Sequence, residues 1–221
     1  MIHTHDLREG NKGVEVWRAQ ILLSEYGFPL ILDGDFGPKT KAAVEAAQDK
    51  LEVPVTGVLY QEQQELLMTE ALRNAEIGSP HFLPFLVGLS YLGVAEFADP
   101  GENPFIQQFL LGVGMAPDDE IPWCSAFINT CCAIAGIPGT GKATARSWLT
   151  WKAGGAVEVP LLGDLVIFSR GQRDGWQGHV AFYGGRVRTA IKAYGGNHGN
   201  QVKLSLYLEE RVLGYRRAIV C

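Results

Sequence analysis

The stretch Pro122-Trp123-Cys124-Ser125-Ala126-Phe127-Ile128-Asn129-Thr130-Cys131-Cys132 decides the fold of the longer part of this chain. It is mostly apolar, follows the acidic residues 118–120 and is closed by Gly136, so it predicts one buried helix. Cys124 falls in the first turn of that helix. Unpaired backbone N–H groups and the positive end of the helix dipole favour a thiolate there and lower a cysteine pKa. Cys124 is therefore a candidate nucleophile, and the same N–H groups are candidate oxyanion donors.

Two strand-like segments follow, Gly163-Asp164-Leu165-Val166-Ile167-Phe168 and His179-Val180-Ala181-Phe182-Tyr183. The polar loop 169–178 between them predicts an antiparallel pair, and a third strand is predicted over 186–194. His179 opens its strand beside Gly178 and shares a face with the alternate residues of that strand. A histidine at this place can face a cleft where a helix begins, so it is the candidate base.

The segment Gly195-Gly196-Asn197-His198 follows the third predicted strand. The side-chain carbonyl of Asn197 is a candidate acceptor for the ring N–H of His179, which would fix the imidazole tautomer. Cysteine, histidine and asparagine then occur in the chain order of papain. His198 competes with Asn197 for this role, and we interpret it as a solvated loop residue.

These segments together resemble the CHAP family, the cysteine- and histidine-dependent amidohydrolases/peptidases, and above all its phage and prophage branch. The similarity spans about residues 82–217. It implies a papain-like fold, in which a helix with the nucleophile packs on an antiparallel sheet. By position it implies that Cys124 is the nucleophile, His179 the general base and acid, and Asn197 the orienting residue. Some members carry a glutamate near the third position, where this chain has Gly195 and Gly196.

Three more residues are candidates for substrate contact. Trp123 either lines a substrate groove or packs inside the domain. Asp119 is either a helix-start charge or a grip on a peptide amine. Gly178 adjoins the candidate base and is expected to border the substrate. The neighbouring Cys131 and Cys132 are expected to be buried apolar residues.

The first part of the chain is helical in pattern. Apolar residues at helical spacing up to Leu22 predict a helix that Gly27 ends. The run Asp33-Gly34-Asp35-Phe36-Gly37-Pro38-Lys39-Thr40 predicts a tight turn and a second helix that begins at Pro38. A third helix is predicted from Gln61 to about Leu72.

Residues 8–72 resemble the three-helix peptidoglycan-binding module of cell-wall hydrolases, through the segment 13–20, the segment 33–44 and Gln48. We expect the turn residues 33–37 to hold the turn rather than to touch a ligand. The predicted fold class is α+β. A small three-helix bundle occupies residues 1–72, a linker residues 73–82, and a papain-like domain, with helices packed on an antiparallel β-sheet, residues 83–221.

Composition and sequence pattern argue against several classes of partner and cellular location. The 221 residues carry a net charge of −5 without a basic run, which argues against nucleic acid as the main partner. The sequence contains no run of 18 apolar residues, which a membrane-spanning helix would need, so no membrane insertion is expected. The start of the chain lacks the pattern of a secretory signal, so we expect synthesis in the bacterial cytoplasm and action on the wall after release. A phage endolysin or an injected effector would fit that expectation.

The predicted function is a bacteriolytic peptidoglycan hydrolase, acting as an endopeptidase or as an N-acetylmuramoyl-L-alanine amidase. Peptidoglycan is the expected partner, the expected state is a monomer, and no cofactor or metal is expected. Two alternatives stay open. One is a non-catalytic wall-binding protein that keeps the fold as a scaffold. The other is a zinc-dependent amidase, which the absence of HxxxH and HExxH patterns and the scattered histidines disfavour.

Overall fold

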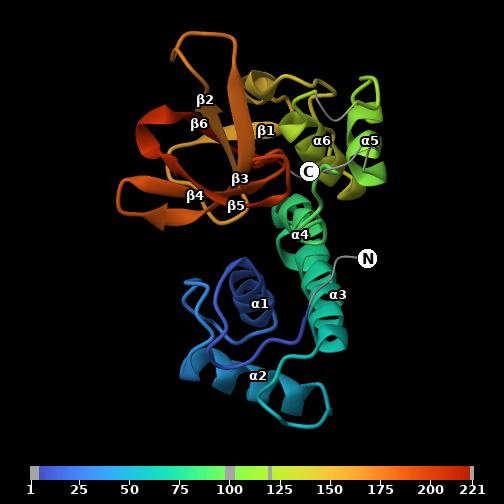
Figure 1. The fold of residues 1–221 in the computed structure, drawn as a ribbon, viewed down its shortest axis with the longest axis vertical. Helices are drawn as coiled ribbons and strands as arrows, with labels where there is room; N and C mark the ends of the chain where they lie inside the picture. The colour runs from blue at the N-terminus through green and yellow to red at the C-terminus, as the bar shows by residue number, and fades with distance from the viewer. Residues whose placement is uncertain (1–4, 98–102, 119–120, 220–221) are drawn as a thin grey trace. The chain divides into compact units, whose positions relative to one another are not determined.

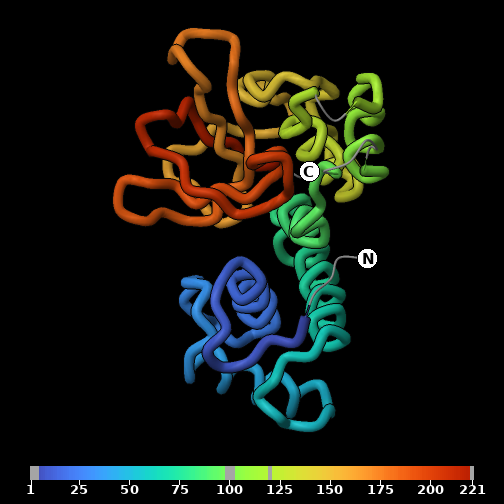
Figure 2. The backbone as a smooth tube through the Cα atoms, in the orientation of Figure 1, coloured from blue at the N-terminus to red at the C-terminus, as the bar shows by residue number. Residues whose placement is uncertain are grey.

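The computed structural model describes residues 5–97, 103–118 and 121–219, whose backbone is traced in Figures 1 and 2. The chain divides into two compact units, residues 1–79 and 80–221. The fold is α+β, as the sequence predicts, because the first unit is helical and the second carries helices on an antiparallel sheet. No helix within the described ranges is both long enough and apolar enough to cross a bilayer.

The first unit contains three helices, α1 (Val14–Glu25), α2 (Pro38–Lys50) and α3 (Gln61–Gly78). Gly27, with φ +106°, lies just beyond α1, and Pro38 is the first residue of α2, as predicted. Helix α3 is longer than predicted, since residues 73–78 continue the helix instead of forming a linker. Ala71 and Ala75 are both buried one turn apart, so the apolar face of α3 extends past the expected end.

Two buried glutamines hold the loops of the first unit. The side chain of Gln20 donates to a carboxylate oxygen of Asp33 at 2.8 Å and accepts the N–H of Gly34 at 2.9 Å. The side chain of Gln48 binds the loop 56–58 in the same way, accepting two of its backbone N–H groups. Buried amides that satisfy loop N–H groups fix a loop conformation. The turn residues therefore have the structural role that the sequence predicts.

The second unit is built on one six-stranded sheet in the order β1-β6-β2-β3-β4-β5, and every neighbouring pair is antiparallel. Its strands are β1 (Gly154–Val157), β2 (Leu165–Ser169), β3 (Gly178–Val187), β4 (Ala190–Gly195), β5 (Lys203–Leu208) and β6 (Val212–Ala218). The predicted pairing of the segments before and after the polar loop is confirmed as β2 with β3. The predicted third strand is wrong at its start, because Arg186 and Val187 still belong to β3 and Arg188, with φ +54°, makes the turn.

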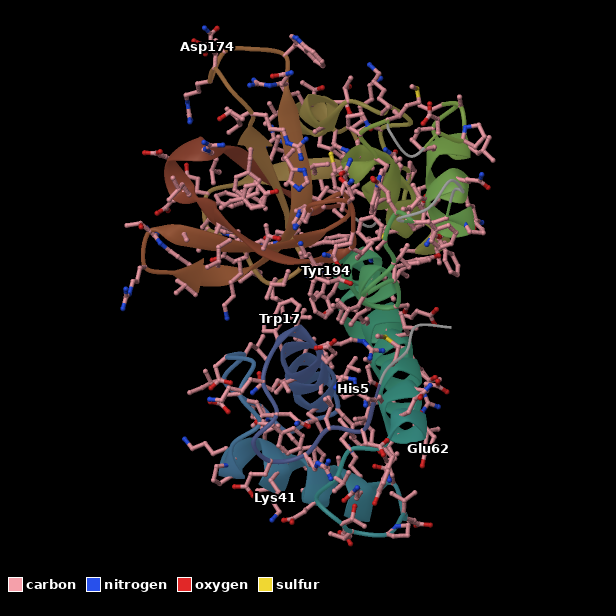
Figure 3. All side chains as sticks on the ribbon, viewed as in Figure 1. His5, Trp17, Lys41, Glu62, Asp174 and Tyr194 are labelled. Carbon is pink, nitrogen blue, oxygen red and sulfur yellow. The ribbon has the colours of Figure 1, made fainter. Side chains whose placement is uncertain are left out.

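Helices α4 (Leu83–Leu89), α5 (Pro104–Leu111) and α6 (Cys124–Ile134) lie on one side of the sheet (Figure 1). Aromatic rings join the two layers: Phe182 of β3 lies 6.4 Å from Phe127 of α6 and 5.5 Å from Phe85 of α4, between ring centroids. The Tyr194 hydroxyl, labelled in Figure 3, donates to the carbonyl of Gly88 at 2.9 Å. The predicted helices on an antiparallel sheet are confirmed. Three short 3₁₀ helices complete the unit, η1 (Pro80–Phe82), η2 (Ala145–Thr150) and η3 (Glu209–Arg211).

Candidate active site

The site forms where strand β3 has a free edge. Its first residues pair with β2 along 178–182, whereas β4 pairs with β3 only from Phe182 onward. The backbone of residues 178–181 therefore has no strand partner on the β4 side. The start of helix α6 and the loop after β4 fill this place. Backbone groups at such an edge can bind a side chain instead of a strand.

Cys124 is the first residue of α6, as predicted, and is 2% exposed. Its sulfur accepts hydrogen bonds from backbone N–H groups, above all that of Val180 at the free edge. Burial raises the pKa of the Cys124 thiol, and these N–H groups together with the charge of Arg170 oppose that rise. The predicted lowering of this pKa is thus outweighed in the folded protein, because the helix-start groups act on a desolvated sulfur.

His179 is fully buried and its imidazole is bound on both nitrogens. Its Nε2 lies 2.5 Å from Nε2 of His198, and its Nδ1 lies 3.2 Å from a guanidinium nitrogen of Arg170. Arginine can only donate, so Nδ1 accepts, Nε2 carries the hydrogen and His198 accepts it. The pKa of His179 is held well below its ordinary value, above all by burial and to a smaller extent by His198 and Arg170. The imidazole is therefore neutral in this structure.

The ring of Tyr207, from β5, supports both histidines. It stacks on His179 with 5.2 Å between centroids and an angle of 9°, and lies 5.4 Å from His198. Tyr207 also shares a hydrogen bond with Arg170. Cys124 and His179 thus have common neighbours in Arg170, Tyr207 and the N–H of Val180. The structure brings the two predicted residues to one place.

Asn197 does not hold the predicted position. The structure gives no hydrogen bond between Asn197 and His179 within the described residues, and His198 contacts the imidazole instead. Asn197 has φ +58°, so the chain turns at this residue and presents the next side chain to the ring. The interpretation of His198 as a solvated loop residue is wrong, because His198 is 2% exposed.

Trp123 is not a groove residue. It is fully buried, and its indole N–H donates to a carboxylate oxygen of Glu96 at 2.9 Å. Gly196 packs directly on its ring, where a Cβ would come within 2.4 Å of the indole. A Cβ on Gly195 would likewise stand 3.1 Å from Ala181. The two glycines thus let the loop before His198 approach the start of α6, so this sequence leaves no room for a larger residue here.

A cleft of about 290 Å³ opens over Cys124. Its lining includes Gly178, together with the segment 143–145, Arg170 and Trp176, and contact of Gly178 with a substrate stays a prediction. Asp119, the remaining candidate for substrate contact, lies outside the described residues. The cleft is the space in which a substrate can reach the sulfur.

Two cleft residues, Arg170 and Trp176, are not marked by any of the sequence patterns above. Both lie in the loop between β2 and β3. The loop projects from the sheet, with Asp174 near its tip (Figure 3), and its Trp176 is 79% exposed. Two arginines fix the loop. The guanidinium of Arg146 donates to the backbone carbonyls of Arg173 and Gln177 in the loop, and that of Arg173 donates to the carbonyl of Val212 in β6. One sequence signal was available, the predicted antiparallel pairing of the segments on either side of the loop 169–178. In the structure Ser169 pairs with Gly178, so Arg170 follows one residue beyond and bonds Gln177, close to the candidate base.

No group of three or more histidine, cysteine, aspartate or glutamate side chains is placed to hold a metal ion in the part of the chain that the structure describes. Cys131 and Cys132 are buried in α6, as predicted, and burial raises the pKa of Cys132 to about 12. Neither of them lines the cleft over Cys124.

The first unit has a surface groove of its own. A hollow of about 420 Å³ lies between the loop after α1 and the start of α2, and its lining includes Ile31, Asp35 and Lys39. Ile31 is 71% exposed there. An exposed aliphatic side chain between charged neighbours suits a ligand with both apolar and polar groups.

Comparison with known proteins gives one family match. Residues 12–67 match the family PG_binding_1, described as "Putative peptidoglycan binding domain". No curated protein matches the sequence.

Two solved structures are similar to parts of the chain. The SleB N-terminal domain is 26% identical, with a TM-score of 0.31, and the match covers 32% of this chain and 99% of that one. A lipoprotein-like protein of the NLP/P60 family from Staphylococcus aureus is 18% identical, with a TM-score of 0.41. That match covers 82% of this chain and 62% of the staphylococcal chain, so this chain spans less than two thirds of it.

We expect Gly196→Ala to lower the free energy of unfolding by roughly 1–3 kcal/mol, because the new methyl group overlaps the ring of Trp123. Gly78→Ala is the matched control, since a Cβ there meets nothing within 4 Å. Helix propensity makes this control neutral or stabilising by up to about 1 kcal/mol. Urea denaturation followed by circular dichroism measures both, and equal stability of the two variants would contradict the packing described.

Stability should fall as the pH drops below about 6.5. Burial lowers the pKa of His198 to about 3 and that of His179 well below its ordinary value, so the unfolded chain takes up protons first. Each histidine then lowers the free energy of unfolding by up to about 1.4 kcal/mol for each pH unit of acidification. Urea denaturation between pH 7.5 and 5 measures this slope, and His198→Asn should reduce it. A slope that the substitution leaves unchanged would refute the burial of a neutral His198.

Proposed function

We propose that this protein hydrolyses amide bonds of bacterial peptidoglycan by a thiol mechanism. Cys124 is the nucleophile, His179 the general base and acid, and His198, in place of Asn197, the positioning residue. One observation carries the proposal: the start of α6 and the bound pair of histidines meet at the same free edge of β3, beneath a cleft. A buried cysteine with only a packing role has no need of a buried, hydrogen-bonded pair of imidazoles at the same strand edge.

The reaction begins when the Cys124 thiol gives its proton to Nδ1 of His179. The sulfur then forms a bond to the carbonyl carbon of the substrate, and backbone N–H groups at the start of α6 hold the developing oxyanion. The imidazolium returns the proton to the leaving amine as the C–N bond breaks. Water, deprotonated by His179, then hydrolyses the thioester and restores the thiol.

His198 has the role that a third residue has in such sites. It accepts the Nε2 hydrogen of His179 and so leaves Nδ1 as the nitrogen that can take a proton. Tyr207 holds the plane of the same ring by stacking. Burial raises the thiol pKa and lowers the imidazole pKa, so proton transfer belongs to the bound complex rather than to the empty site.

The first unit is proposed to hold the enzyme on the wall. The match of residues 12–67 to a peptidoglycan-binding family supports this, and the groove beside Ile31 is the candidate contact. A linked binding module raises the local concentration of a catalytic unit on an insoluble polymer. The bond cut is either that of an endopeptidase or that of an N-acetylmuramoyl-L-alanine amidase.

Four properties expected from the sequence stay predictions: membership of the CHAP family, a phage endolysin role, release from the cytoplasm and a monomeric state. A non-catalytic wall-binding protein and a zinc-dependent amidase are the competing functions. Loss of activity with iodoacetamide but not with EDTA supports the thiol mechanism, and the reverse pattern supports the metal-dependent one.

We expect Cys124→Ala to abolish release of soluble fragments from purified sacculi while binding to sacculi is kept. Cys132→Ala is the matched control from the same helix and should retain activity, because its thiol lies outside the cleft. Turbidity loss and mass spectrometry of released muropeptides measure the reaction, and sedimentation with sacculi measures binding. Lysis by the Cys124→Ala protein would rule out the thiol mechanism.

We expect His198→Ala to lower kcat by roughly 10²- to 10⁴-fold, because His179 loses the acceptor that fixes its tautomer. His198→Asn should recover part of this loss, since an amide oxygen can accept the same hydrogen. Asn197→Gly tolerates the positive φ and should retain activity. Kinetics on a defined muropeptide separate these effects. Equal losses in the Ala and Asn variants at position 198, or a large loss in Asn197→Gly, would overturn the assignment.

A further inference from the structure

Arg170 occupies the position that the proposed mechanism needs to be free. Its guanidinium donates to Nδ1 of His179 at 3.2 Å, and Nδ1 is the nitrogen that must accept the proton of Cys124. The other ring nitrogen is engaged by His198. A guanidinium is always charged and cannot accept a proton, so in the empty site the lone pair of the base is occupied.

The charge of Arg170 adds to this effect. A cation beside an imidazole disfavours the imidazolium form, and Arg170 contributes to the low pKa of His179. Within the described residues no carboxylate forms an ion pair with Arg170, although other arginines of this unit, such as Arg217 with Asp164, have one. Arg170 is half-buried, and its hydrogen-bond partners among the described residues, His179 and Tyr207, are neutral.

The described lining of the cleft supplies no compensating charge. Arg170 is the one charged side chain among its described lining residues, and the others are apolar or neutral, such as Trp176 and Gln177. The backbone of Arg170 is fixed, because its N–H donates to the carbonyl of Gln177 across the loop and Arg146 binds the same carbonyl. An arginine that reaches a neutral wall from a fixed backbone, without a carboxylate partner among the described residues, is complementary to an anion, and the fork geometry of its guanidinium matches a carboxylate.

We propose that the substrate brings a free carboxylate, close to the scissile amide, which pairs with Arg170 and draws the guanidinium away from Nδ1 of His179. This inference rests on the proposed function and names its substrate class, wall peptides with an unmodified carboxylate at that position. When the carboxylate binds, the thiol proton can move to Nδ1, and the imidazolium that forms faces a neutral guanidinium–carboxylate pair. The empty site stays unreactive because its base is engaged.

The test uses the full-length protein and two synthetic muropeptides that differ at one group. One carries the free carboxylate beside the scissile amide, and the other carries a primary carboxamide there. We expect kcat/KM to be about 10- to 100-fold higher for the carboxylate peptide, which is the range for a charge-assisted pair. Equal values for the two peptides would overturn the inference, and this comparison needs no variant that must fold.

Substitution at position 170 tests the same contact from the protein side. Arg170→Gln should remove the preference, with a loss on the carboxylate peptide and an unchanged or higher rate on the carboxamide peptide. Arg170→Lys keeps the charge without the fork and should keep part of the preference. Arg188→Gln, at the turn between β3 and β4, is the matched control and should behave as the unsubstituted protein. An equal loss on both peptides in Arg170→Gln would assign Arg170 a structural role only.

These outcomes are separable from failure of the proposed function. If Cys124→Ala still cleaves the carboxylate peptide, the thiol mechanism fails, whatever the preference of the protein. If Cys124→Ala is inactive and the unsubstituted protein shows no preference, the role of Arg170 alone is refuted. The rate of Cys124 alkylation by iodoacetamide gives a second readout: the uncleaved N-methyl amide analogue of the carboxylate peptide should change that rate, and its carboxamide counterpart should not.

Discussion

The contact between the start of helix α6 and the free edge of strand β3 determines the site. Strand β4 stops short of the first residues of β3, which leaves the N–H of Val180 available to the sulfur of Cys124. Gly196 allows this approach because only a residue without a Cβ fits against the ring of Trp123. A helix start, a strand edge and a loop from three distant parts of the sequence thereby meet within one small volume.

Burial is the dominant electrostatic influence at this contact. It disfavours the thiolate of Cys124 and the imidazolium of His179 at the same time, so the empty site holds two neutral groups. A helix start by itself favours the thiolate, but the desolvation of the sulfur is the larger effect here. In the proposed mechanism, the charged forms of these groups must be stabilised by what the substrate brings, so an arginine in the cleft without a carboxylate partner among the described residues would affect reactivity.

The two units divide the requirements of acting on a polymer. The first is held by buried amides, Gln20 and Gln48, which fix its loops and leave the groove beside Ile31 at the surface. The second places its reactive groups below a cleft. Under the proposed function, substitutions in the groove beside Ile31 would test binding, and substitutions at Cys124 or His198 would test cleavage.

The sequence by itself determined the α+β class, the buried helix with Cys124 in its first turn, the antiparallel pair of strands that includes His179, and the turn residues of the first unit. Each follows from local rules of periodicity, capping and turn chemistry. Only the tertiary structure decided that His198 rather than Asn197 meets the imidazole, that Trp123 is buried and that Arg170 reaches Nδ1. These depend on one positive φ at Asn197, on close packing at Gly196 and on cross-strand neighbours, none of which a linear pattern specifies.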